Sequence, residues 1–427
     1  MKCRLSYGRK GLELALPDSW EVTVLEKRTM PAAPDSGAVV ADALAQPLGS
    51  GTLAEEAWAG ATACILVCDF TRPVPNGLVL RPMIQQLTAA GLRQEDITIL
   101  VATGLHRPNE GAELAGVIQD PWILDHVRVE NHYARRDKDH ELVGTTTQGI
   151  PVRLDRRFLN ADVRIVVGLV EPHFMAGWSG GRKLVLPGIA SAQSITAFHC
   201  ARILGHPRAT TAVLDGNPLH EAQGEVLGMI GRTLAMNLVI DESRALSFAG
   251  FGGIAESHAA AVRFAEPCFR VEVPRGFPVV LSSAAGFPLD TTWYQAVKGV
   301  CCGASVLEKG GDLFVAAQCA QGFGSADFLE SQRRLCRQGK AAFHAEAGAR
   351  PHALIDEWET VMLLKALEVG TVHLYADGLS EEEHGLTATL RCRDLESDIR
   401  AAMEKSGQRR IAILPEGPYV APSVKAP

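Results

Sequence analysis

A lysine follows two glycines and an arginine in the stretch EPHFMAGWSGGRKLVLPGIAS, which covers residues 171–191. The backbone amides of Ser179, Gly180 and Gly181 can bind an anion at the start of a helix or turn. The spacing differs from that of a Walker A loop, GxxxxGK[ST], so a nucleoside triphosphate site is poorly supported. Lys183 could contact a phosphate, act as a nucleophile or Schiff-base lysine, carry an attached group, or lie on the surface. The apolar sequence that follows it argues against a surface lysine.

Three runs of aliphatic residues, at residues 61–70, 96–103 and 162–170, are typical of buried parallel strands. Each run ends in a polar turn, with the sequences DFTRPVP, GLHRP and EPHF. The carboxyl ends of parallel strands form the ligand crevice of an open α/β sheet, so we expect these turns to meet at one site. Among the polar residues in these turns are Asp69, Thr71, Arg72, His106 and His173.

The side chains in these turns suit anion binding and proton transfer. Arg72 can bind a phosphate or carboxylate through two parallel hydrogen bonds, and Thr71 can add a hydroxyl donor. His106 and His173 suit general acid–base chemistry because histidine titrates near neutrality. Taken singly, each residue would also fit a surface turn or a structural role. Their shared position at strand ends favours a functional role.

A third histidine, His199, lies 16 positions after Lys183. His106, His173 and His199 are too widely spaced for a short metal motif such as HExxH. Any metal site would therefore have to be assembled by the fold.

The stretch YQAVKG contributes three more polar residues, Tyr294, Gln295 and Lys298. Gln295 and Lys298 are three positions apart, so on a helix they share a face. They could bind a carboxylate there, or they could simply form the surface of the helix.

The composition is that of a globular protein. Of 427 residues, 47% are hydrophobic and 21% are charged, and the formal net charge is −7. No apolar run reaches the roughly 18 residues of a transmembrane helix, and the N-terminal sequence has no apolar segment typical of a signal peptide. The ten cysteines show neither zinc nor iron–sulfur spacing. We expect a cytoplasmic protein with reduced thiols that binds neither nucleic acid nor membrane.

A second series of strand patterns begins near residue 275, with helical patterns between them. A chain of 427 residues is longer than one hydrophobic core usually accommodates. We therefore predict two α/β lobes with parallel-rich sheets and an active-site cleft between them. The loop EVPRGFP marks the boundary because its prolines and glycine interrupt regular structure. The predicted domains are residues 1–272 and residues 273–404, and residues 405–427 could pack back on the first.

Seven stretches, in order along the chain, resemble the nickel-pincer-dependent lactate racemase family, which acts on 2-hydroxy acids. They are LSYGRKGLELALPD, CDFTRPVP, TGLHRP, NHYARRDKDHELVGTT, EPHFMAGWSGGRKLVLPGIAS, FHC and YQAVKG. The resemblance covers nearly the whole chain and is most specific at HFMAGWSGGRK, while the second domain matches more loosely. It implies that the N-terminal domain binds the cofactor and that the C-terminal domain caps the substrate.

The resemblance also implies roles for the residues around the cofactor. In this family the lysine of SGGRK forms a thioamide with a pyridinium-3,5-bisthiocarboxylic acid mononucleotide, whose carbon and sulfur atoms hold nickel. Lys183 would be the attachment point, and His199 would be the protein ligand to nickel. The other residues expected to bind the cofactor are Asp69, Thr71, Arg72, Ser179 and Gly180.

Roles in substrate binding and proton transfer are implied in the same way. His106 and His173 would be the acid–base pair on opposite sides of a 2-hydroxy acid. One would take the hydroxyl proton while the cofactor accepts the C2 hydride, and return of the hydride to the other face would invert the centre. The residues expected to bind the substrate are Arg72, Tyr294, Gln295, Lys298 and Trp358.

The function implied is a racemase or epimerase of lactate or a larger 2-hydroxy acid, including sugar acids, with cofactor-synthesis proteins as partners. The alternative is a non-catalytic carrier or storage protein for the nickel-pincer nucleotide, although binding alone would not require both histidines. A nicotinamide-dependent dehydrogenase is disfavoured because no well-placed GxGxxG motif follows a first strand.

Overall fold

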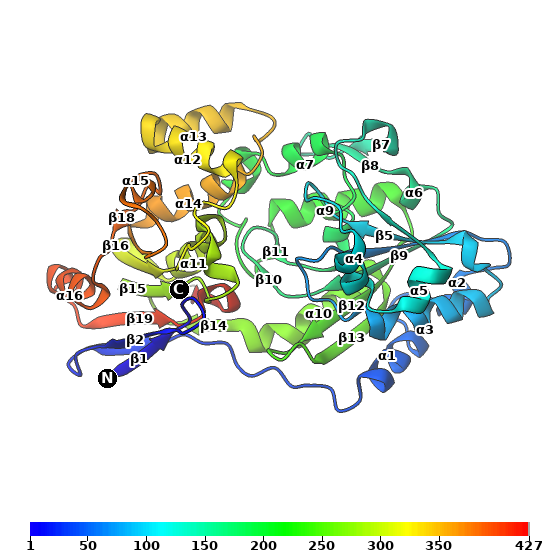
Figure 1. The fold of residues 1–427 in the computed structure, drawn as a ribbon, viewed down its shortest axis with the longest axis horizontal. Coiled ribbons are helices and arrows are strands. Elements are labelled where there is room, and N and C mark those ends of the chain that lie inside the picture. Colours follow the sequence, from blue (N-terminus) through cyan, green and yellow to red (C-terminus); the bar gives the residue numbers. More distant parts are fainter. Residues whose placement is uncertain (426–427) are drawn as a thin grey trace. The chain divides into compact units, whose positions relative to one another are not determined.

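The computed structural model describes residues 1–425, which fold into two compact units (Figure 1). The central unit consists of Thr29–Phe198 and Leu214–Cys268. The terminal unit consists of Met1–Arg28, His199–Val213 and the chain from Phe269 onward. Each unit is an α/β structure with a parallel-rich sheet, which confirms the predicted fold class. The active-site cleft stays a prediction.

The central unit is built on a six-stranded sheet with the order β13-β12-β9-β4-β5-β6. Neighbouring strands are parallel, except that β13 is antiparallel to β12. Every residue of β4 is buried, because a central strand of a parallel sheet is covered on both faces. The strands are β4 (Ala63–Cys68), β5 (Ile97–Ala102), β6 (Arg128–Asn131), β9 (Val163–Leu169), β12 (Leu234–Ile240) and β13 (Leu246–Gly253).

Helices and two small antiparallel pairs complete the central unit (Figure 1). The helices are α1 (Ser36–Ala45), α2 (Leu53–Glu56), α3 (Asn76–Ala89), α4 (Gly111–Ile118), α5 (Pro121–His126), α6 (Arg156–Leu159), α7 (Ala192–Phe198), α9 (Pro218–Ile230) and α10 (Ile254–Phe269). The pairs are β7 (His140–Thr145) with β8 (Pro151–Asp155), and β10 (Pro172–His173) with β11 (Gly177–Trp178). Strands β4, β5 and β9 match three predicted runs, and they are neighbours in the sheet.

The terminal unit contains a six-stranded sheet in which every pairing is parallel, with the order β18-β17-β16-β15-β19-β3. Its strands are β3 (Glu21–Val24), β15 (Phe277–Ser283), β16 (Leu307–Ala316), β17 (Thr371–Tyr375), β18 (Leu390–Arg391) and β19 (Arg410–Leu414). Its helices are α8 (Ala201–Leu204), α11 (Trp293–Ala304), α12 (Ala326–Gln338), α13 (Lys340–Ala349), α14 (Glu357–Val369), α15 (Glu381–His384) and α16 (Leu395–Ser406). Smaller pairs join β1 (Lys2–Leu5) to β2 (Leu12–Ala15) and β14 (Arg270–Val273) to β20 (Ala421–Val424).

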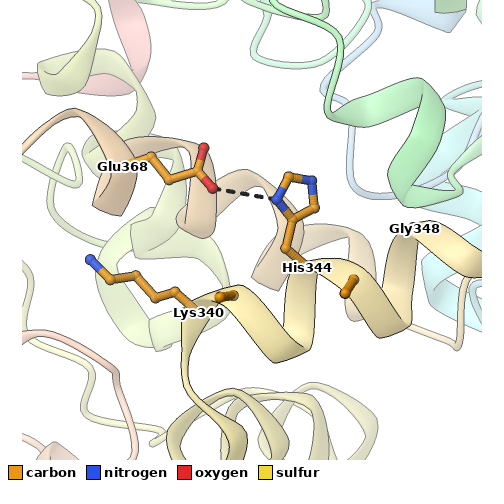
Figure 2. A pocket seen from close by; sticks show the side chains of 6 residues that line it. Lys340, His344, Gly348 and Glu368 are labelled. Atoms are coloured by element: carbon orange, nitrogen blue, oxygen red, sulfur yellow. Dashed lines mark ion pairs between the residues drawn. The ribbon is translucent and has the colours of Figure 1, made fainter.

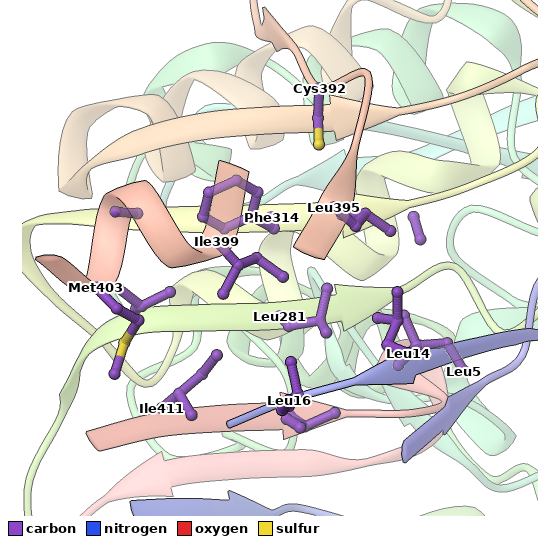
Figure 3. Packing of buried hydrophobic residues seen from close by; sticks show 14 of the residues in the cluster. Leu5, Leu14, Leu16, Leu281, Phe314, Cys392, Leu395, Ile399, Met403 and Ile411 are labelled. Carbon is purple, nitrogen blue, oxygen red and sulfur yellow. The ribbon is translucent and has the colours of Figure 1, made fainter. Parts of the chain in front are cut away.

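The N-terminal hairpin shares a hydrophobic core with this sheet. Leu5 and Leu14 of the hairpin are buried in one cluster with Leu281 of β15, Phe314 of β16 and Ile399 of α16 (Figure 3). Removal of these aliphatic and aromatic surfaces from water stabilises the packing of the hairpin against the sheet. The N-terminal hairpin therefore shares one core with β15, β16 and α16.

This division differs from a single domain boundary at residue 272. Residues 1–28 belong to the terminal unit because β3 pairs with β19 and the hairpin fills the core described above. Residues 199–213 also belong to the terminal unit, although they lie between two parts of the central unit in sequence. The segment from residue 405 belongs to the terminal unit too, where β19 pairs with β15. These pairings join segments hundreds of residues apart, so local sequence patterns do not indicate them.

Candidate active site

The turn after β4 holds a buried carboxylate. Asp69 is only 5% exposed, and its Oδ1 atom accepts a 2.5 Å hydrogen bond from the hydroxyl of Thr71 and a weaker one from the Thr71 amide. Arg72, the next residue, forms an ion pair with Glu171, which follows β9. The turn is therefore tied to the neighbouring strand end by opposite charges.

His106, from the loop after β5, binds the same carboxylate. Its Nδ1 atom lies 2.6 Å from Oδ2 of Asp69, and the imidazole side chain is 60% exposed. A carboxylate can only accept a hydrogen bond, so Nδ1 carries the hydrogen and Nε2 keeps its lone pair. Asp69 is also one of the expected cofactor-binding residues. In the structure, Oδ1 accepts a hydrogen bond from Thr71 and Oδ2 accepts one from His106. In a neutral ring with this tautomer, Nε2 is the atom able to accept a proton.

His173, in the hairpin formed by β10 and β11, has the opposite arrangement. Its Nδ1 atom accepts hydrogen bonds from the backbone amides of Met175 at 3.3 Å and Ala176 at 3.1 Å. The hydrogen of the neutral ring is therefore on Nε2. Asp69, His106 and His173 follow three neighbouring strands, β4, β5 and β9, so the structure brings the predicted turns to one edge of the sheet.

The SGGRK turn is fastened to the sheet by buried polar groups. The hydroxyl of Ser179 donates to Leu169 O at 2.7 Å and accepts from the amide of Glu171 at 3.0 Å, so it is already used inside the fold. Gly180 has a φ of 83°, and a Cβ atom there would lie 2.5 Å from a methyl carbon of Val170. Only glycine fits this position without strain. The amide of Gly181 donates to Asn237 Oδ1 at 2.9 Å.

Lys183 lies in a 3-10 turn, Gly181–Leu184, that follows these glycines. The charge of Lys183 influences the pKa of the thiol of Cys68, the last residue of β4. Burial raises the pKa of Cys68 to about 11, and the positive charges of Arg72 and Lys183 act in the opposite direction. Both cations therefore lie near the carboxyl end of β4. The amide of Gly104, two residues before His106, donates at 2.9 Å to the carbonyl oxygen of Gly188, so the loops that carry His106 and Lys183 are joined.

Four of the five predicted substrate-binding residues lie in the terminal unit, where they form two hydrogen-bonded pairs, whereas Arg72 lies in the central unit. Lys298 donates a 2.5 Å hydrogen bond to Gln295 Oε1, one turn away on α11. The indole nitrogen of Trp358, on α14, donates to the hydroxyl of Tyr294 at 2.9 Å. The ring of His199 lies 5.2 Å from the ring of Trp358, measured between centroids. His199 is thus part of the same unit as Gln295 and Lys298, whereas Lys183 belongs to the central unit.

A buried carboxylic acid, Glu359, follows Trp358 on α14 and lies close enough to Lys298 to feel its charge. Glu359 is 1% exposed, and its Oε2 atom has no hydrogen-bond partner among the described residues. Burial raises the pKa of Glu359 to about 8, and the positive charge of Lys298 acts to lower it. A carboxyl with this pKa changes charge near neutral pH, close to a predicted substrate-binding lysine.

Metal-ligand groups and surface hollows are two further features that can mark a functional site. Residues 1–425 contain no group of three or more His, Cys, Asp or Glu side chains arranged to hold a metal ion. An open hollow of about 660 Å³ lies on α13 and α14, where His344 forms a 3.5 Å ion pair with Glu368 (Figure 2). Both side chains are at least half exposed, and the predicted site residues lie elsewhere in the described chain.

Two family models of known domains match the chain. The lactate racemase N-terminal domain matches residues 7–212, and the lactate racemase C-terminal domain matches residues 275–421. The chain belongs to the lactate racemase family. The lactate racemase of Thermoanaerobacterium thermosaccharolyticum is 28% identical over 416 residues, which are 97% of each chain. That of Lactiplantibacillus plantarum is 27% identical over 383 residues, 88% of this chain and 89% of the relative.

Solved structures agree with this assignment. The lactate racemase apoprotein of Thermoanaerobacterium thermosaccharolyticum superposes with a TM-score of 0.89 and 27% identity, and all of both chains is covered. A Thermotoga maritima protein, 19% identical, matches with a TM-score of 0.66 over 93% of this chain and 100% of its own, which shows the fold alone. As a member of the lactate racemase family, the chain is an isomerase of the racemase class.

Several residues of this lactate racemase family member were missed in the sequence. Asn237 and His258 support the SGGRK turn, the latter through a 2.9 Å hydrogen bond between its Nε2 atom and the carbonyl oxygen of Ser179. Burial lowers the pKa of His258 to about 3, so the ring is neutral. Glu359 was missed as well. The available signal was a polar residue within an apolar run, as in LAMNLVI around Asn237 and ETVMLL after Trp358.

Proposed function

We propose that this racemase interconverts the enantiomers of a 2-hydroxy acid, either lactate or a larger acid such as a sugar acid. The observation that carries the proposal is a pair of histidines after β5 and β9, the two strands on either side of β4. One histidine is bound to a carboxylate and the other to backbone amides. Inversion of a carbon that bears a hydroxyl needs one proton acceptor and one proton donor. The lactate racemase names of the relatives support a hydroxy acid as substrate.

The proposal includes a nickel-pincer nucleotide attached to Lys183, with His199 as its protein ligand to nickel. The residues present fit such a group. Arg72, which is paired with Glu171, and Lys183 both lie near the carboxyl end of β4. The guanidinium of Arg72 suits the phosphate of a mononucleotide, and the amine of Lys183 suits covalent attachment. The described residues provide no cluster of metal ligands, so most ligands would have to come from the cofactor itself. Such a cofactor, when bound, would supply a reversible acceptor for the C2 hydride of the substrate.

For the other expected cofactor-binding residues we propose roles in supporting the loops around the cofactor. Thr71 donates to Asp69, and the hydroxyl of Ser179 is held by the backbone after β9. Together with Gly180, these residues shape the loops around the cofactor, and Asp69 acts through His106. Contact with the phosphate falls chiefly to Arg72, because Lys183 is used for covalent attachment.

Proton transfer and substrate binding are then assigned to side chains of this chain. His106 takes the hydroxyl proton of one enantiomer at Nε2, because Asp69 holds the hydrogen on Nδ1. His173 serves the other enantiomer. Arg72, Lys298 and Gln295 bind the substrate carboxylate, and Tyr294 and Trp358, which are hydrogen-bonded to each other, pack against the rest of the substrate.

We also propose that cofactor-synthesis proteins load this enzyme and that it acts in the cytoplasm. Among residues 1–425, every helix is too short or too polar to cross a membrane.

The test combines mass spectrometry with an activity assay. The protein is made together with cofactor-synthesis proteins, and its intact mass is compared with that of Lys183→Ala. We expect a mass increase and racemisation of a pure enantiomer only in the parent protein. Full racemisation by Lys183→Ala would contradict the proposal. An adduct on the parent without racemisation of any 2-hydroxy acid would favour a cofactor carrier.

A further inference from the structure

Lys365, on helix α14, donates hydrogen bonds to three backbone carbonyl groups of one distant segment. Its Nζ atom lies 3.0 Å from Leu204 O, 3.0 Å from His206 O and 2.9 Å from Ala209 O. An ammonium group has three donors and no acceptor, so these three bonds use it completely. The lysine and its acceptors are more than 150 residues apart in sequence.

The segment that receives these bonds has little regular structure of its own. This segment begins at His199 and contains the single helical turn α8. An irregular stretch follows, since residues 205–217 form neither helix nor strand. Carbonyl groups at a helix end and in an irregular stretch lack the partners that regular structure provides. Leu204 is the last residue of α8, where a cation is also favoured by the helix dipole. Lys365 thus adds a donor to each of these three carbonyl groups, of which His206 O also accepts from the amide of Ala209 at 3.0 Å.

The same helix contacts the beginning of the segment. Trp358 and Lys365 are seven positions apart on α14 and therefore lie on one face of it. The ring of Trp358 contacts the ring of His199, and the ammonium group of Lys365 holds residues 204–209. Residues 199–209 are thus attached to α14 at both ends of this stretch.

We infer that Lys365 is a positioning residue that holds the segment carrying His199 in place, so that the imidazole is preorganised for nickel. This inference rests on the proposed role of His199 as a nickel ligand. Lys365 itself touches neither the metal nor the substrate. Residues that orient metal ligands typically change metal affinity by roughly 10–100-fold when they are replaced.

The test uses Lys365→Met, which keeps the length of the side chain and removes its three donors. Lys365→Arg is a second variant, because its planar guanidinium keeps the charge but does not reproduce three convergent donors. Lys340→Met is the matched control. Lys340 also bonds α14, through a 2.9 Å hydrogen bond to Leu367 O, but it holds no part of the His199 segment. Thermal unfolding establishes that each variant is folded.

Three readouts are measured on cofactor-loaded protein: the mass of the Lys183 adduct, the rate of nickel loss to a chelator, and amide hydrogen exchange of residues 201–213. For Lys365→Met we expect an unchanged adduct, nickel loss about 10–100-fold faster, and faster exchange in this segment. Lys365→Arg is expected to fall between the parent and Lys365→Met, and Lys340→Met to match the parent.

Two outcomes would overturn the inference. Exchange in Lys365→Met equal to that in the parent would show that the lysine does not hold the segment. Faster exchange with unchanged nickel loss would show a purely structural role. A parent protein that gains neither adduct nor nickel would instead contradict the proposed function, and exchange of the unloaded proteins would still decide whether Lys365 holds the segment.

Discussion

The Nδ1 atom of His106 lies 2.6 Å from Oδ2 of Asp69, and this contact determines which nitrogen of the imidazole can accept a proton. The carboxylate is buried and is also bound by Thr71, so it is held in place on both oxygens. His106 is more exposed, with its Nε2 atom left to act as a base. The carboxylate of Asp69 thus fixes the hydrogen of the His106 ring on Nδ1.

The first prediction concerns this pair. Asp69→Asn replaces a pure acceptor with an amide, which no longer favours the hydrogen on Nδ1 of His106. We expect kcat to fall by roughly 10²–10⁴-fold, the range that general acid–base groups contribute, while the Lys183 adduct still forms. Steady-state racemisation and intact mass measure the two effects. Glu113→Gln is the control, since Glu113 binds the neighbouring Arg107 at 2.7 Å and should leave kcat near the parent value. Equal rates in the parent and Asp69→Asn would remove Asp69 from the mechanism.

A second prediction follows from the opposite tautomers of His106 and His173. His173 must move its hydrogen from Nε2 to Nδ1, and lose two amide hydrogen bonds, before it accepts a proton at Nε2. We therefore expect the loaded enzyme to react faster in its first turnover with the enantiomer whose hydroxyl faces His106. Stopped-flow spectra of the cofactor with each pure enantiomer measure this difference.

Single substitutions of the two histidines identify which enantiomer each one serves. His106→Ala and His173→Ala should each lose most net interconversion, by roughly 10²–10⁴-fold. Each should still react once with one enantiomer, and the preferences of the two variants should be opposite. Loss of reaction with the same enantiomer in both variants would count against a two-histidine mechanism.

A third prediction concerns stability and pH. The pKa of Glu359 is raised from its ordinary value of 4.5 to about 8 because the carboxyl is buried. Between these values the folded protein binds more protons at this site than the unfolded chain, so the free energy of unfolding falls as pH rises from about 4.5 to 8. The slope is at most about 1.4 kcal/mol per pH unit. Glu359→Gln should flatten this dependence in denaturant titrations, and Glu368→Gln, at a half-exposed site, should not. A parental slope in Glu359→Gln would show that Glu359 does not titrate in this range.

A fourth prediction tests whether the N-terminal hairpin belongs to the terminal unit. Leu5 is fully buried in the core shared with Phe314 and Ile399. Leu5→Ala should lower the free energy of unfolding by about 2–5 kcal/mol, because it removes buried surface and leaves a cavity. Leu390→Ala is the control, because Leu390 is 55% exposed and its substitution should change the free energy of unfolding little. A cost below 1 kcal/mol for Leu5→Ala would show that the hairpin contributes little to this core.

The sequence by itself determined the features that depend on neighbouring residues. The aliphatic runs that became β4, β5 and β9 are recognisable because strands buried on both faces need apolar side chains throughout. The polar turns at their ends could be assigned to one site, because parallel strands place their carboxyl ends at one edge. The SGGRK stretch with Lys183 is contiguous in sequence, so its resemblance to the family could also be recognised without the structure.

Only the tertiary structure decided which distant residues meet. Asp69 and His106 are 37 residues apart, and nothing in either turn shows that the carboxylate binds the imidazole. Lys365 and the segment after His199 meet only because α14 and residues 199–213 fold into the same unit. Hydrogen bonds and burial of this kind depend on the packing of separate elements. They therefore set tautomers, pKa values and the position of the proposed nickel ligand in ways that local sequence patterns do not specify.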